Sequence, residues 1–167
     1  ANLYVRIVTF NTAYCNITHF SRNTQKVPGM IKFYFHPSPN PLKIALYLEE
    51  TGEPYELIPV DTRKGGQHTE AFKAINPNGQ VPVLIDEGEV LTQILAMVGY
   101  LDKRFPQAHL LPDVPMARAR AIETLSWLNN TVHPTFTHVF MPHKYSDQPA
   151  VQADIRSHAV PQYRALM

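Results

Sequence analysis

The chain has 167 residues, of which 44% are hydrophobic, enough to form one hydrophobic core or two small ones. A formal charge of +1, with no basic stripe interleaved with aromatic side chains, argues against nucleic acid as a partner, and apolar runs too short to span a membrane indicate a soluble protein. The single cysteine, Cys15, excludes an internal disulfide and fits a reducing compartment, so we expect a cytoplasmic protein.

Residues 1–29 are predicted to be an extension that is not part of the fold. They mix asparagine, threonine and aromatic residues with no regular period after Phe10, and Met30 follows a Pro-Gly pair. We therefore expect the natural start of the protein at Met30. The alternative is that Val5–Phe10 forms an additional strand packed on the domain.

Residues 32–52 predict a strand, a loop and a helix. Lys32–Phe35 is a short run of strand-forming residues, and the prolines at positions 37, 39 and 41 indicate a loop after it. Asn40 followed by Pro41 predicts a helix start, with the asparagine as N-cap and the proline at the first helical position. Helical spacing of apolar residues continues to Thr51, and Gly52 fits the position after the last turn.

Residues 55–103 predict a strand, a short helix, a β-hairpin and a second helix, with Asp61–His68 as a loop. The strands are Tyr55–Val60, Val83–Ile85 and Glu89–Leu91, the hairpin turn is Asp86–Gly88, and the helices are Glu70–Ile75 and Gln93–Lys103. The order βαβ followed by ββα implies a small mixed sheet with helices on its faces.

The remainder of the chain predicts helices. Phe105–Pro115 contains three prolines and is predicted to be a linker. A long helix then ends at Val132, and its continuous apolar face consists of Ala117, Ala121, Leu125, Leu128 and Val132, with Trp127 beside it in the core. Val151–Met167 resumes a helical pattern that Pro161 interrupts.

From Met30 onward the sequence resembles the glutathione transferase family. The resemblance rests on Asn76-Pro77-Asn78-Gly79-Gln80-Val81-Pro82-Val83-Leu84 and the later helix start Gln93–Leu101. It implies an α/β thioredoxin-like N-terminal domain (βαβ-ββα) over residues 30–111 and an incomplete all-α C-terminal domain over residues 112–167, truncated because the family's helical domain continues with further helices. Ser38-Pro39-Asn40 with Lys64-Gly65-Gly66-Gln67 most resembles the bacterial Nu-type group of glutathione-dependent disulfide reductases and peroxidases.

The resemblance implies a glutathione site around Val81 and Pro82. In thioredoxin-like folds this proline follows a cis bond, and the backbone before it pairs with the cysteinyl part of glutathione; the alternative is a trans proline in an ordinary turn. The resemblance further assigns the γ-glutamyl end to Gln93 and Ile94, where isoleucine replaces an expected serine. Losing that hydroxyl should cost about 1.5–3 kcal/mol of binding. Gln67 and Lys64 would reach the glycyl carboxylate, although Lys64 also fits a flexible surface loop.

Ser38 and Asn40 are candidate catalytic residues. The thiol of glutathione has a pKa near that of free cysteine, so an enzyme must stabilise the thiolate by hydrogen bonds or positive potential. The loop after the first strand leads onto a helix N-terminus, whose N–H groups and dipole favour an anion. By resemblance, Ser38 and Asn40 hold the positions of the threonine and asparagine of the Nu-type group. The alternatives are a plain N-cap role for Asn40 and a plain loop role for Ser38.

His133 is a third catalytic candidate, because Thr131–His138 resembles the segment in which some bacterial members carry a histidine facing the thiol. The alternative is a histidine at the C-terminal end of a helix, where the dipole favours it. His133, His138 and His143 are spaced by five, which forms no helical face, so we expect no metal site.

Together these features predict an enzyme, a glutathione-dependent transferase that uses glutathione as co-substrate and a small electrophile or disulfide as second substrate. Disulfide-reductase or peroxidase chemistry is compatible with the same site. The alternatives are a catalytically silent binding module, which Ile94 favours, and a truncated fragment. Because dimers are common in the family, we expect a homodimer.

Overall fold

The structure is a computed structural model of the chain, and it describes residues 29–166. The predicted extension before Gly29, with Cys15 and the alternative strand Val5–Phe10, therefore lies outside the described residues. The chain divides into two units, one that ends at Leu110 and one that begins at Leu111, and each unit is described by itself.

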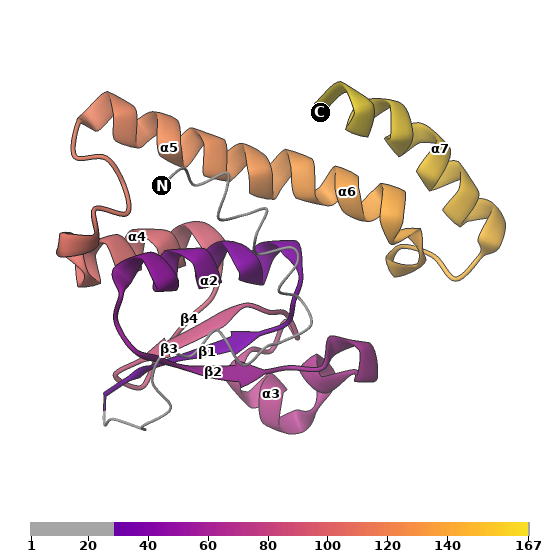
Figure 1. Ribbon diagram of the computed structural model, residues 1–167. Helices are drawn as coiled ribbons and strands as arrows, with labels where there is room; N and C mark the ends of the chain where they lie inside the picture. The colour runs from indigo at the N-terminus through magenta and orange to yellow at the C-terminus, as the bar shows by residue number, and fades with distance from the viewer. Residues whose placement is uncertain (1–28, 167) are drawn as a thin grey trace. The chain divides into compact units, whose positions relative to one another are not determined.

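In the described part of the first unit, four strands form one mixed sheet in the order β2-β1-β3-β4 (Figure 1). Its strands are β1 (Ile31–Phe35), β2 (Tyr55–Pro59), β3 (Val83–Asp86) and β4 (Glu89–Leu91). β1 and β2 are parallel, whereas β3 runs antiparallel to both β1 and β4. The thioredoxin-like mixed sheet predicted from the sequence is confirmed.

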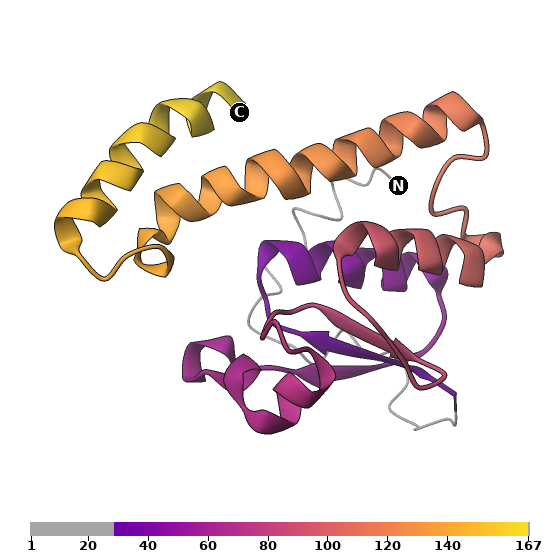
Figure 2. The same cartoon turned by 180° about the vertical axis from the view of Figure 1, so that it is seen from behind.

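Helices cover both faces of this sheet. α2 (Pro39–Thr51) and α4 (Ile94–Arg104) lie side by side on one face, and α3 (Glu70–Ile75) covers the other (Figures 1 and 2). The side chains of β1 alternate between the two layers: Phe33 is fully buried, and the next residue, Tyr34, packs edge-on against Phe72 of α3. Short 3₁₀ turns at Thr62–Lys64, Gly66–His68 and Pro106–Ala108 complete the unit.

The start of α2 differs from the prediction. The helix begins at Pro39, and Ser38 is its N-cap, with φ −145° and ψ 161°, so the prediction of Asn40 as N-cap is wrong. The N–H groups of a helix's first turn lack helical partners, so prolines at the first and third helical positions cost the helix no hydrogen bond. At the other end Gly52 adopts a left-handed conformation (φ 71°), as predicted.

A buried carboxylate ties the hairpin to α4. Asp86, with a side chain only 3% exposed, accepts hydrogen bonds on Oδ2 from the Tyr100 hydroxyl at 2.6 Å and from Arg104 Nε at 3.1 Å. Burial, followed by the hydrogen bond to Asp86, raises the pKa of Tyr100. Arg104 also lies 3.9 Å from Glu87 in the hairpin turn, so the Asp86 carboxylate and this ion pair together link the hairpin to the helix.

The second unit is helical within its described residues. α5 (Pro115–Trp127) continues through a π-helical turn (Leu128–Val132) into α6 (His133–Phe140), and α7 (Pro149–Leu166) packs on α6 after a 3₁₀ turn (Pro142–Lys144). The predicted helix end at Val132 is therefore wrong. Pro134 lacks an N–H and its ring opposes the carbonyl four residues earlier, which accounts for a local widening rather than an end of the helix. Likewise, Pro161 lies inside α7 without ending it.

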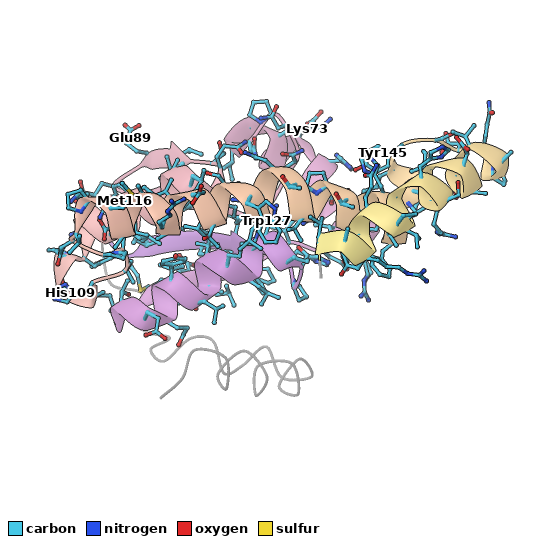
Figure 3. All side chains as sticks on the ribbon, turned by 90° about the horizontal axis from the view of Figure 1, so that it is seen from above. Lys73, Glu89, His109, Met116, Trp127 and Tyr145 are labelled. Atoms are coloured by element: carbon cyan, nitrogen blue, oxygen red, sulfur yellow. The ribbon has the colours of Figure 1, made fainter. Side chains whose placement is uncertain are left out.

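The predicted apolar face of the long helix is confirmed only in part. Leu125 is buried, but Ala117 is exposed and Trp127, labelled in Figure 3, is 42% exposed, so the prediction of Trp127 as a core residue is wrong. Among residues 29–166 no helix is long and apolar enough to span a membrane.

We predict that Tyr100→Phe lowers the free energy of unfolding by about 1.5–3 kcal/mol, because it removes a hydrogen bond to a buried carboxylate. Urea denaturation measures the change. The matched control is Tyr163→Phe in α7, whose described contacts are made by its ring, and it should change stability by less than about 0.5 kcal/mol. Equal losses in the two variants would contradict the role given to Asp86.

Candidate functional site

The strand registers bring four chain segments to one edge of the sheet. β1 and β3 pair Tyr34 with Val83, and β3 and β4 pair Leu84 with Leu91. If the β1–β3 register is continued by two residues, position 36 lies opposite position 81. If the β3–β4 register is continued in the same way, position 82 lies opposite position 93. β2 is parallel to β1, so the segment after β2 leaves the sheet at the same edge. The site residues predicted within the first unit all lie in segments that follow or precede strands at this edge.

The bend after β1 is fixed by backbone carbonyls. The Ser38 N–H donates to the His36 carbonyl at 2.7 Å, and the His36 ring bonds through Nδ1 to the carbonyl of Val60 at 3.1 Å. The Ser38 hydroxyl also donates to the His36 carbonyl, but at 3.4 Å, which is long for an O–H···O bond. The Ser38 hydroxyl can therefore turn to a stronger acceptor, such as an anion.

Asn40 supplies the remaining donors at the start of α2. The first and third helical positions are Pro39 and Pro41, which have no N–H, so the backbone N–H of that turn belongs to Asn40. Its side-chain Oδ1 accepts a hydrogen bond from Lys43 Nζ at 2.9 Å. Among the first three residues of α2, Asn40 alone thus has a backbone N–H to offer an anion, because prolines occupy the other two positions.

The segment after β2 packs tightly on the loop before β3. A Cβ on Gly79, which has φ +60°, would lie 3.1 Å from both the Gln67 carbonyl and His68 Nδ1, so only glycine lets the two loops approach so closely. Gln67 Nε2 lies 3.1 Å from His68 Nε2, whereas its Oε1 is buried and has no hydrogen-bond partner within residues 29–166. This Oε1 can accept a hydrogen bond from an N–H or O–H group of a ligand. Lys64 differs: its side chain is 87% exposed and lies 3.7 Å from Asp61.

The bond between Val81 and Pro82 is cis, as predicted. The loop before it is held by Asn76, a buried residue whose Nδ2 donates to the Gln80 carbonyl at 2.8 Å and whose Oδ1 accepts from the Asn78 N–H at 3.2 Å. Sequence reasoning missed this role for Asn76. Asn76 stood out only as the first residue of the motif Asn76–Leu84, and the motif does not show that its side chain bonds to backbone groups of the same loop.

Gln93 and Ile94 form the junction between β4 and α4. Gln93 is the N-cap of α4 and adopts φ 71° and ψ 125°, a region that residues other than glycine rarely occupy. Its side chain is exposed, whereas Ile94 is 6% exposed and belongs to the hydrophobic core. Ile94 therefore offers a ligand its backbone N–H at the first helical position and no polar side-chain group.

His133 belongs to the second unit, at the first position of α6. Its ring stacks on Phe136, with ring centroids 6.5 Å apart and an interplanar angle of 15°. The alternative of a histidine at a helix C-terminus is wrong, because α6 continues to Phe140. Within the described residues, no group of three or more histidine, cysteine, aspartate or glutamate side chains is arranged to hold a metal ion.

Comparison with known families and proteins points to one family. A family profile described as the N-terminal domain of glutathione S-transferase matches residues 37–104. Maleylacetoacetate isomerase of Pseudomonas aeruginosa is 40% identical over 105 residues, which cover 61% of this chain and 49% of that protein. Glutathione S-transferase GstA of Escherichia coli O157:H7 is 32% identical over 129 residues, covering 75% of this chain and 64% of that protein. The chain thus spans about half to two thirds of the length of these relatives.

Solved structures show the same fold. A glutathione transferase homologue from Sulfitobacter with bound glutathione superimposes with a TM-score of 0.76 at 27% identity, over 83% of this chain and 67% of that one. A glutathione transferase from Burkholderia graminis, with two glutathione molecules bound per subunit, gives a TM-score of 0.72 at 28% identity, over 86% of this chain and 61% of that one.

We predict that Gln93→Gly unfolds with a free energy about 1–2 kcal/mol higher than that of Gln93→Ala, because glycine relieves the strained backbone and alanine does not. Chemical denaturation of the pair isolates the backbone, since both variants lack the glutamine side chain. Glu87, at φ 51° in the hairpin turn, provides a matched pair in a less strained left-handed conformation. A difference at Gln93 no larger than that at Glu87 would contradict strain at the junction.

Proposed function

We propose that the chain is a member of the glutathione S-transferase family, and that its first unit binds glutathione and activates the thiol for attack on an electrophile or a disulfide. The observation that carries this proposal is the meeting, at one sheet edge, of Ser38 and Asn40 after β1, the cis Val81–Pro82 bond before β3, and Gln93 after β4. The bound glutathione in similar structures supports the same ligand.

Each part of glutathione has a chemically suitable partner at this edge. The β1–β3 ladder reaches Tyr34 and Val83, so the backbone of Val81 is available to pair with the cysteinyl residue. The exposed Gln93 amide provides an oxygen for the γ-glutamyl ammonium, and the N–H of Ile94 provides a donor for its carboxylate. Gln67 would donate from its Nε2 to the glycyl carboxylate, with the exposed Lys64 adding positive charge nearby.

Thiol activation rests on donors at the start of α2. The Ser38 hydroxyl and the Asn40 side-chain and backbone N–H groups stabilise the thiolate by hydrogen bonds, and the helix dipole adds positive potential. The thiol proton leaves to solvent, and the thiolate sulfur then forms a bond to the second substrate. With chlorodinitrobenzene the C–Cl bond breaks and chloride leaves; with a disulfide the S–S bond breaks, a mixed disulfide with glutathione forms and the other sulfur leaves as a thiolate. We retain His133 as a further catalytic candidate on the family resemblance, with disulfide reduction as in the Nu-type group, a homodimeric assembly and a cytoplasmic location as parts of the same proposal.

A silent binding module is the second candidate, and the buried Ile94 favours it. A core isoleucine at the first position of α4 removes the side-chain hydroxyl that would bind the γ-glutamyl carboxylate. Glutathione would then bind weakly or not at all, and the unit would act through other contacts.

We predict that the protein binds glutathione and turns over chlorodinitrobenzene or hydroxyethyl disulfide, and that Ser38→Ala and Asn40→Ala each lower kcat/KM by about 10- to 100-fold through loss of a thiolate donor. Steady-state assays with both substrates measure the effect. Ser157→Ala, at an exposed position of α7, is the control and should retain the parent activity. Failure to bind glutathione, together with absence of turnover in both assays, would refute the proposed enzyme.

We predict that Ile94→Thr binds glutathione about tenfold more tightly than the parent, because it adds a hydroxyl at the helix start while keeping a β-branched side chain. Its unfolding free energy should fall by about 1–2 kcal/mol, and that of Ile94→Ser by about 2–4 kcal/mol, because core volume is lost. Calorimetric titration and denaturation measure the two effects. Binding by the variants alone would identify the parent as a silent module, and unchanged affinity would show that the Ile94 side chain does not limit binding.

A further inference from the structure

Lys43 is a charged residue beside the thiol site that the sequence pattern did not single out. It lies one turn after Asn40 on the same side of α2, and its Nζ donates to Asn40 Oδ1 at 2.9 Å. Both side chains are half-buried, and burial lowers the pKa of Lys43. The ammonium group of Lys43 is thus partly removed from water and bonds to a proposed catalytic residue.

This contact decides which way the Asn40 amide faces. An ammonium group has only donors, so the atom of Asn40 that meets it must be the oxygen. The NH₂ group, with both of its donors, then occupies the other side of the amide plane. Without such a partner an asparagine could turn either its oxygen or its nitrogen toward a ligand, and an oxygen would repel a thiolate.

The orientation matters because this helix end is poor in donors. Two of its first three helical residues are prolines, so the side chain of Asn40 carries a share of anion binding that backbone N–H groups supply at other helix starts. We propose that Lys43 is a positioning residue, which holds the Asn40 amide so that its NH₂ group faces the thiolate of bound glutathione. This inference rests on the proposed function of the same site.

The test measures ionisation of bound glutathione in the full chain. Lys43→Met is expected to reduce the thiolate fraction at a given pH by about three- to tenfold, read from the ultraviolet absorbance of the thiolate across a pH titration. Binding of S-methylglutathione, which has no thiol to ionise, should change by less than about twofold, because the rest of the site is intact. Lys43→Arg, which keeps a donor-only cation, should restore most of the thiolate.

A double-mutant cycle separates positioning from a bare charge effect. If Lys43 acts through Asn40, Lys43→Met should have almost no further effect on thiolate formation in the Asn40→Ala background. Lys73→Met is the matched control, because Lys73 is an exposed lysine of α3, labelled in Figure 3, and its loss should leave both ligands unaffected. If Lys43→Met does not fold, judged by circular dichroism, Lys43→Leu replaces it as the variant without a donor.

The outcomes distinguish this inference from the function on which it rests. A parent protein that binds neither glutathione nor S-methylglutathione refutes the proposed function and the inference together. An unchanged thiolate fraction in Lys43→Met, with the parent binding both ligands, overturns the inference alone. It is also overturned if both ligands weaken equally, which indicates a structural role, or if the effects of Lys43→Met and Asn40→Ala are additive, which indicates a charge acting by itself.

Discussion

The hydrogen-bond register of β1, β3 and β4 is the constraint on which the candidate site depends. Each strand is short, yet the pairings of Tyr34 with Val83 and of Leu84 with Leu91 align their ends. A slip by one residue in either ladder would move its side chains to the opposite face of the sheet. The alternation of buried and more exposed residues in β1, together with the buried Val83 and Leu84 of β3, therefore specifies the register. Loop residues far apart in the sequence are therefore held together by the hydrophobic pattern of the strands that they flank.

At the start of α2, side chains take the place of backbone hydrogen-bond donors. The prolines of α2 begin the helix at a fixed place but remove N–H groups that would face an anion. The chain compensates with Asn40, whose amide is held by Lys43, and with the hydroxyl of Ser38. At the junction before α4 the balance differs, because Ile94 contributes to the core and leaves the recognition of a carboxylate to the backbone. Stability and ligand binding thus compete for the same position.

Much of the fold follows from local patterns. The short helix Glu70–Ile75 and the strand Glu89–Leu91 have the predicted bounds, and the left-handed Gly52 ends α2 as predicted. Within the site, the cis Val81–Pro82 bond was expected from the family resemblance rather than from spacing. The predictions that failed, an N-cap at Asn40, a helix end at Val132 and a buried Trp127, each required knowing how prolines or neighbouring elements pack.

The sequence by itself determined the order of the elements and the mixed character of the sheet, because hydrophobic period, proline and glycine act over a few neighbours, and the family resemblance supplied the candidate residues. Only the tertiary structure decided which polar groups of those residues are available to a ligand. It shows that Ile94 faces the core, that Asn76 bonds to backbone groups of its own loop, and that the Asn40 oxygen is occupied by Lys43. Burial and the direction of a polar side chain depend on partners brought close by packing, and a pattern along one chain does not contain them.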